Sequence, residues 1–164
     1  MTFLLRKPRP DEAHALADLH VATWRETYTH LLPADFFSES YVTGRRRMWE
    51  HVLAHPREEI SVLVAEQDGA LVGFAWAGPS RGPATEQPPR ALTLYAIYVL
   101  TAQHGTGLGQ ALLDRTLGSE PAMLWVALEN PRAIAFYRRN GFEFDGAEET
   151  DPAAPAFTDA RMVR

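Results

Sequence analysis

The amino-acid sequence predicts one domain of the mixed α/β class, in which a single β-sheet carries helices on its faces. Three observations support this prediction. The 164 residues are enough for one hydrophobic core and too few for two. Apolar residues make up 46% of the chain and charged residues 23%, as in ordinary globular proteins. Strand and helix patterns follow one another in the order β-α-α-β-β-β-α-β-α-β-β, so we expect residues 1–164 to form a single mixed sheet with its helices.

The first half of the chain is expected to hold two helices and three strands. Asp11 is a candidate N-cap for the first helix, and Pro56 stops the second one. Asp68-Gly69 between two β-branched runs is the signal of a tight hairpin. The expected elements are a strand at 3–6, helices at 11–28 and 43–54, and hairpin strands at 60–66 and 71–77.

In the second half, residues 79–90 contain four prolines and one glycine and are expected to form a loop. Asn130-Pro131 is a helix start, with Asn as the cap and Pro at the first helical position. Asn140-Gly141 is suited to a left-handed helix end. The expected elements are strands at 92–100 and 122–128, a helix that ends near 117, a helix at 131–139, and closing strands at 142–144 and 157–163.

Composition argues against several classes of function. The absence of cysteine excludes disulfides, thiolate nucleophiles and thiolate metal sites. His51 and His55 could share a helix face, but with no third ligand in view a solvated pair is favoured, and we expect no metal. The net charge of −5 argues against nucleic-acid binding. Without a long apolar window or a signal-peptide pattern, we expect no membrane association and a cytoplasmic location.

A glycine-rich loop carries the main chemical signal. A strand ends near Val99, glycines stand at 105, 107 and 109, and a helix follows directly. Glycines let a ligand approach the main chain, and the first amides of a helix attract an anion such as a phosphate. Gln110-Ala111 after the last glycine excludes a P-loop, and the spacing also fails the dinucleotide pattern. The alternative is a glycine-rich helix start that binds nothing.

A second segment, at residues 130–142, combines an Asn, Ala-Ile, Phe-Tyr and Gly-Phe at fixed spacing. Ala133 and Tyr137 are four residues apart, so one helix face turns the tyrosine ring towards the sheet. Asn130 caps this helix whether or not it also contacts a ligand. Tyr137 alone would also suit a core position with its hydroxyl in water.

Taken together, the two segments resemble the GCN5-related N-acetyltransferases (GNAT). Residues 104–109 are similar to the family's pyrophosphate-binding signature Q/R-x-x-G-x-G/A, with His104 in place of Gln or Arg. The resemblance implies a mixed, mostly antiparallel sheet that is splayed between its fourth and fifth strands, with acetyl-CoA in the cleft. The implied cofactor-binding residues are Ile97, Tyr98, Val99, His104, Gly105, Thr106, Gly107, Leu108, Gly109, Asn130 and Tyr137.

The resemblance also implies roles for individual residues. Tyr137 would be the catalytic acid that protonates the departing CoA thiolate. Asn130 would bind near the pantetheine arm, and the backbone of Ile97 and Val99 would pair with the pantetheine amides like an added strand. Because backbone amides do most of the phosphate binding, His104 in the first signature position should cost little affinity.

The acceptor side is less well marked. Many relatives use a glutamate as general base where this sequence has Thr93, which cannot serve as one. Tyr95, two residues on, is a candidate proton relay or a residue that packs on the first helix. In similar proteins the end of the first helix lines the acceptor pocket, which makes Trp24, Glu26 and Tyr28 candidate substrate-binding residues. Glu26 is a candidate base, and a solvated helix glutamate is the alternative.

The expected function is transfer of an acetyl group from acetyl-CoA to a primary amine by direct attack in a ternary complex. The acceptor is a small molecule, for which the acidic balance suits polyamines or aminoglycosides, or a peptide or protein amine. The alternative is a GNAT-like domain that senses acyl-CoA without catalysis. Dimers are common in similar proteins, so a homodimer is a further expectation.

Overall fold

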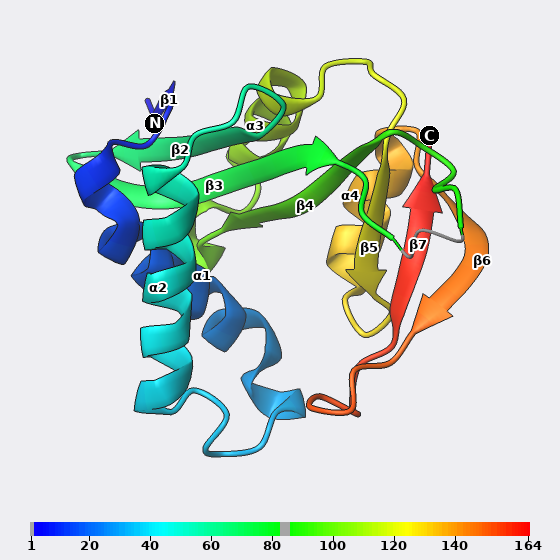
Figure 1. Ribbon diagram of the computed structural model, residues 1–164, viewed down its shortest axis with the longest axis horizontal. Helices are drawn as coiled ribbons and strands as arrows, with labels where there is room; N and C mark the ends of the chain where they lie inside the picture. Colours follow the sequence, from blue (N-terminus) through cyan, green and yellow to red (C-terminus); the bar gives the residue numbers. More distant parts are fainter. Residues whose placement is uncertain (1, 83–85) are drawn as a thin grey trace.

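A computed structural model describes residues 2–82 and 86–164 (Figure 1). Residues 83–85 belong to the loop predicted at 79–90, and that part of the prediction lies outside the described residues.

A seven-stranded sheet in the order β1-β2-β3-β4-β5-β7-β6 forms the centre of the molecule. Only β4 and β5 run parallel; every other pair of neighbours is antiparallel. The strands are β1 (Leu4–Arg6), β2 (Ser61–Gln67), β3 (Ala70–Pro79), β4 (Leu92–Val99), β5 (Met123–Ala127), β6 (Glu143–Glu149) and β7 (Asp159–Val163).

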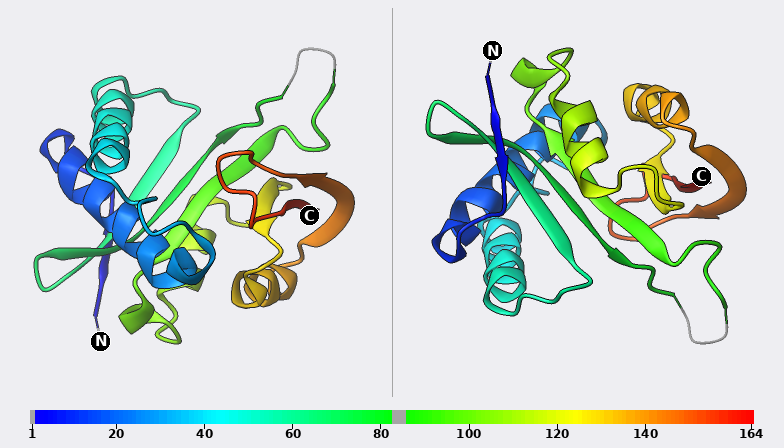
Figure 2. Two further views of the ribbon diagram at one scale, coloured as in Figure 1. Left: turned by 90° about the horizontal axis from the view of Figure 1, so that it is seen from below. Right: turned by 90° about the horizontal axis from the view of Figure 1, so that it is seen from above.

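Helices cover both faces of this sheet, as Figure 2 shows, which confirms the predicted fold class. On one face lie α1 (Ala13–Tyr28) and α2 (Glu39–Ala54), and on the other lie α3 (Leu108–Thr116) and α4 (Pro131–Arg139). Three short 3₁₀ helices accompany them in the described part of the chain: η1 (Pro10–Glu12), η2 (Thr29–Leu31) and η3 (Thr101–Gln103).

Each face has its own apolar core. Beneath α1 and α2, the rings of Trp49 and Phe74 are fully buried and pack edge to face with centroids 5.4 Å apart. Beneath α3, Leu112 and Leu113 are fully buried against the sheet, and Met162 of β7 lies with Leu113 in the core that α4 covers. Burial of this apolar area supplies the main driving force that holds the helices on the sheet.

Several boundaries differ from the sequence prediction; α2, for example, begins at Glu39 rather than at residue 43. Asp11 is not an N-cap; it lies inside η1, and α1 begins two residues later at Ala13. The strand predicted at 142–144 continues as β6 to Glu149, because pairing with β7 resumes beyond an irregularity at Gly146, whose φ is +95°.

The contact between the parallel strands β4 and β5 is brief. They pair only at Thr93 with Met123 and at Leu94 with Leu124, near the start of each strand. The next residue of β4, Tyr95, is the extra residue of a bulge against β3. Beyond it the two strands separate, as Figure 1 shows, and this is the splay that the sequence predicted.

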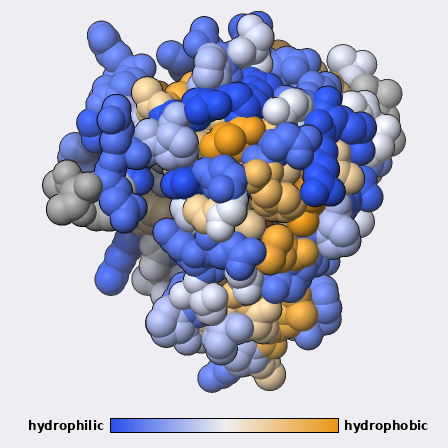
Figure 3. Space-filling model, turned by 90° about the vertical axis from the view of Figure 1, so that its right-hand side faces the viewer, coloured by the Kyte–Doolittle hydropathy of each residue, from blue (hydrophilic) through white to orange (hydrophobic). Residues whose placement is uncertain are grey.

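Figure 3 shows the side of the molecule that carries the carboxyl-terminal strands, where apolar residues gather in a band framed by hydrophilic ones. The homodimer expected from the sequence stays a prediction.

None of the helices in the described part of the chain has the length and apolar character needed to cross a bilayer, and the cytoplasmic location stays a prediction as well.

A partly buried ion-pair network joins β1 to the start of α1. The Arg6 guanidinium donates to Glu12 at 2.6 Å and to Glu66 of β2, and the Arg9 amide donates to Glu12 at 2.6 Å. Glu12 is only 7% exposed. Hydrogen bonds from Arg6, with a further one from Arg9, hold the pKa of Glu12 at about 2.

We expect Glu12→Gln to lower the free energy of unfolding at pH 7 by about 2 kcal/mol, because it removes one of the two carboxylates that pair with Arg6 and the carboxylate that pairs with Arg9. The wild-type Glu12 carboxylate stabilises the fold fully above its ordinary pKa of 4.5 and loses this contribution as pH falls towards about 2. Urea unfolding at pH 7 and pH 3 should therefore show a smaller acid effect in the variant.

Glu59→Gln is the matched control, because the Arg57–Glu59 pair is solvent-exposed and should add little stability. An equal loss in both variants would contradict the role assigned to the network.

Candidate active site

A cavity of about 500 Å³ lies where β4 and β5 separate. Residues from both faces of the sheet form its wall. They come from α1 on one face and from α3 and α4 on the other. The residues that line it are Thr23, Thr27, Ile97, Tyr98, Val99, Gln103, His104, Gly105, Gly107, Gly109, Gln110, Asn130, Arg132, Ala133, Ala135, Phe136, Tyr137 and Arg139.

The glycine-rich loop forms one end of this cavity. Gly105 and Gly107 have φ values of +80° and +87°, a left-handed conformation that favours glycine, and both positions border open space where a side chain would project. Their amides donate to no acceptor in the described residues. The Thr106 hydroxyl donates to the Gln103 carbonyl and accepts from the Leu108 amide, and the Leu108 side chain is fully buried. Thr106 and Leu108 therefore fix the shape of the loop.

The free edge of β4 forms a second wall. Leu100 donates to the Val72 carbonyl at 3.0 Å, which makes the even-numbered residues of β4 the hydrogen-bonded partners of β3. The backbone groups of Ile97 and Val99 therefore point to the other side, into the gap left by β5. This is the orientation that an extended amide-bearing ligand would need to pair with the strand.

One face of α4 supplies cationic and apolar groups that the sequence reading did not single out. Arg132, Phe136 and Arg139 line the cavity. They stand four and three residues apart, a spacing typical of one helix face, so the same periodicity could have identified them. A side-chain carbon at Gly109 would lie 3.8 Å from the Phe136 ring, so α3 and α4 approach closely here. Two guanidinium groups beside free amides suit a phosphate-bearing ligand.

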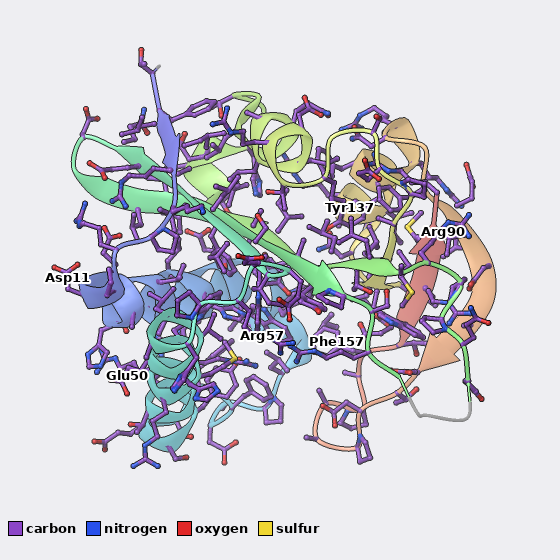
Figure 4. The ribbon with its side chains drawn as sticks, turned by 45° about the horizontal axis from the view of Figure 1, so that its top comes forward. Asp11, Glu50, Arg57, Arg90, Tyr137 and Phe157 are labelled. Atoms are coloured by element: carbon purple, nitrogen blue, oxygen red, sulfur yellow. The ribbon has the colours of Figure 1, made fainter. Side chains whose placement is uncertain are left out.

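Tyr137 projects from α4 into the core beneath it, and it is labelled in Figure 4. Its ring packs against Phe136 and Phe142 with centroids 5.4 and 5.9 Å away. The residue is 8% exposed and lines the cavity, yet its hydroxyl has no hydrogen-bond partner within the described chain. Burial raises the pKa of Tyr137 well above its ordinary value of 10, so the hydroxyl keeps its proton at neutral pH.

Asn130 joins α4 to α1. Its side-chain oxygen accepts from the Ala133 amide at 3.1 Å, which is the predicted N-cap, and its Nδ2 donates to the Tyr28 hydroxyl at 3.1 Å. Tyr28 is itself buried, and burial raises the pKa of its hydroxyl. Asn130 lines the cavity, whereas Tyr28 lies directly behind it.

The other two candidates on α1, Trp24 and Glu26, are not among the residues that line the cavity. The Glu26 carboxylate accepts from the Thr101 amide at 2.7 Å, where the chain leaves β4, and it does not line the cavity. The Trp24 ring packs against Tyr28 and Tyr98, with centroids 5.0 and 6.4 Å away. Glu26 thus fixes the end of β4 in this structure, and Trp24 supports the tyrosines around the cavity.

Thr93 and Tyr95 lie away from the cavity. The Thr93 hydroxyl is buried 2.6 Å from that of Ser80. The bulge turns Tyr95 towards Trp76, whose ring centroid is 5.3 Å away, and its hydroxyl donates to the Pro79 carbonyl. Tyr95 therefore packs at the far end of β4 rather than against α1.

His104, in the first position of the glycine signature, lines the cavity near Arg132. Burial and the charge of Arg132 lower the pKa of its ring, and a hydrogen bond to the backbone of Val99 opposes this shift. The ring is therefore neutral at neutral pH. Within residues 2–82 and 86–164, no three His, Asp or Glu side chains are grouped as a metal site requires.

A strand-loop-helix with free amides, beside two parallel strands that separate, defines a class of α/β fold whose gap suits a ligand with phosphates and amides. The model of the acetyltransferase (GNAT) domain matches residues 58–144. An uncharacterized N-acetyltransferase of Bacillus subtilis, YuaI, is 30% identical over 141 residues, which cover 82% of this chain and 76% of the relative. The chain belongs to the GNAT family of acetyltransferases, as its sequence predicted.

Solved structures share the fold over its full length. PaiA N-acetyltransferase from Thermoplasma acidophilum, in complex with coenzyme A, has a TM-score of 0.68 at 20% identity and covers 100% of this chain and 99% of its own. YncA from Salmonella typhimurium, with its cofactor acetyl-CoA, also has a TM-score of 0.68, at 18% identity, and covers 100% of this chain and 94% of its own.

We expect Gly107→Ala to weaken CoA binding about tenfold, because an alanine strained at positive φ shifts the neighbouring amides, and losing about 1.4 kcal/mol corresponds to that factor. Calorimetric titration with CoA measures the change. Gly44→Ala is the control: this glycine is inside α2 with open space around it, so alanine should stabilise the fold by about 0.5–1 kcal/mol and leave CoA binding unchanged. Equal affinity of Gly107→Ala and wild type would contradict the role of the loop.

Proposed function

We propose that this protein transfers the acetyl group of acetyl-CoA to a primary amine of a small molecule or peptide, by direct attack within a ternary complex. The observation that carries the proposal is the buried hydroxyl of Tyr137 in a cavity that also reaches the glycine-rich loop. One cavity thus combines a proton donor with groups that suit a phosphate.

The described residues fit this co-substrate. Amides of the loop at Gly105 and Gly107, with Arg132 and Arg139, would hold the phosphates. The free edge of β4 at residues 97–99 would pair with the pantetheine amides. When bound, acetyl-CoA supplies an activated acyl group as its thioester.

Tyr137 is the proposed acid. As the amine nitrogen forms its bond to the acyl carbon, the carbon–sulfur bond breaks and the sulfur leaves as a thiolate. A hydroxyl that is still protonated at neutral pH can give its proton to that sulfur. The proton released by the amine passes to water, and Tyr137 regains its own from solvent.

Among the described residues that line the cavity, no carboxylate stands ready as a general base. Thr93 is bonded to Ser80 and cannot take a proton. An alkylammonium group has a pKa near ~10.4, so the acceptor must lose its proton before attack. We therefore assign deprotonation of the acceptor to water.

The test is to incubate the protein with acetyl-CoA and a panel of amines and to follow free CoA with a thiol-reactive dye. The chain contains no cysteine, so it adds no thiol signal of its own. Amine-dependent release of CoA would support the enzyme. CoA binding without release across the panel would favour the alternative, an acyl-CoA-sensing domain.

We expect Tyr137→Phe to lower kcat by about 100-fold with acetyl-CoA binding changed by less than about threefold, since a general acid contributes factors of this order. The ring stays in place in the variant, so the core is kept. Tyr95→Phe removes a hydroxyl from the far end of β4 and serves as the control, with kcat expected to be unchanged. Wild-type turnover in Tyr137→Phe would contradict the assignment.

A further inference from the structure

A half-buried carboxylate without a partner lies near Tyr28, whose hydroxyl bonds to the cavity residue Asn130. Asp159 is the first residue of β7 and pairs in register with Ala127, at the carboxyl end of β5. Alternate residues of β7, Ala160 and Met162, face the core beneath α4. The Asp159 side chain therefore lies on the opposite face, the one that α1 reaches with Tyr28.

No cation compensates this carboxylate in the described structure. Asp159 makes no ion pair or side-chain hydrogen bond there, whereas Glu12 and Asp145 are paired with arginines. The cation nearest along the same strand face, Arg161, is held by Asp145 at 2.6 Å and lies over Trp125. Burial, together with the charges of Glu129, Glu149 and Asp151, raises the pKa of Asp159.

Aromatic rings complete the surroundings of this carboxylate. The Tyr28 ring packs against Trp24 and Phe157, with centroids 5.0 and 4.9 Å away. The centroids of Trp24 and Phe157 are 6.2 Å apart. Phe157 stands two residues before Asp159 and is labelled in Figure 4. Aromatic faces beside a carboxylate are the chemistry that binds an organic ammonium group.

The site is connected to the reacting centre through two tyrosines. Tyr28 packs against Ala127, the register partner of Asp159, and its hydroxyl bonds to the cavity residue Asn130. Burial raises the pKa of both Tyr28 and Tyr98, and the charge of Asp159 adds to this effect. Tyr98 and Tyr137 line the cavity, and the buried Tyr137 hydroxyl is unpartnered there. Tyr28 thus stands between Asn130 of the cavity wall and the strand end that carries Asp159.

We propose that Asp159 binds a positively charged group of the acceptor, so that the preferred substrates are small molecules with a second ammonium group. This inference rests on the proposed acetyltransferase function. The attacking nitrogen must be neutral, and a carboxylate favours the charged form of whichever nitrogen it binds. The productive partner of Asp159 is therefore a second nitrogen of the acceptor, as in a diamine or an amino sugar with several amines.

The experiment compares 1,4-diaminobutane with butylamine at saturating acetyl-CoA. These acceptors share the reacting amine and the carbon chain and differ in the second ammonium group. Wild type should show a higher kcat/KM for the diamine. Asp159→Asn should lower the diamine value by about tenfold or more and the butylamine value by less than about twofold, because only the diamine loses a charge partner.

Glu148→Gln is the matched control. It removes the same charge from an exposed residue whose register partner is Ala160, so its side chain lies on the opposite face of the sheet. This variant should keep the wild-type preference for the diamine. A thermal unfolding curve of Asp159→Asn close to that of wild type shows that the variant is folded, and Asp159→Glu, which restores the charge, should recover part of the preference.

The outcomes are distinguishable. Equal efficiency with both amines in wild type, or an equal loss for both in Asp159→Asn, overturns the role of Asp159 and leaves the acetyltransferase function standing. If no amine, in this pair or in the wider panel, causes release of CoA, the proposed function and this inference are both overturned.

Discussion

The early separation of β4 and β5 is the constraint on which the rest of the structure depends. Parallel neighbours in a sheet would normally hydrogen-bond along their common length, but here pairing stops after Leu94 and Leu124. The bulge at Tyr95 bends β4 at that point and leaves the backbone of residues 97–99 unpaired on one side. The cost of those unpaired groups in a protein interior is the physical reason to expect a ligand with amides in the gap.

The end of α1 holds the gap open at a defined width. Glu26 accepts from the amide of Thr101, just beyond β4, and Tyr28 accepts from Asn130, just beyond β5. Two residues in the last turn of one helix thus fix the carboxyl ends of both separated strands. The Arg6 network in turn anchors the start of α1, so the whole helix acts as a rigid spacer.

The sequence predicted the order of the elements, the glycine loop and the cap at Asn130, because each depends on neighbours within a few residues. It could not assign Glu26 or Tyr28, whose partners stand 75 and 102 residues away along the chain. Simple alternation would place Leu94 and Ala96 on one face of β4, but the bulge residue inserted between them puts these two side chains on opposite faces of the sheet. No local sequence pattern points to Asp159, and its place near Tyr28 follows only from its pairing with Ala127 in the sheet.

An acceptor with two charged nitrogens would also explain why no carboxylate base is found among the described residues that line the cavity. When one ammonium group is paired with Asp159, the pair is close to neutral overall, so the carboxylate no longer favours a proton on the nitrogen that must react. Burial near Tyr98 and Tyr137 acts in the same direction, because desolvation penalises the ammonium form. Deprotonation by water then becomes sufficient, and a residue such as Thr93 can occupy the position where relatives carry a glutamate. If Asp159 orients the acceptor as proposed, the same choice of substrate accounts for the lack of a carboxylate among the described residues that line the cavity.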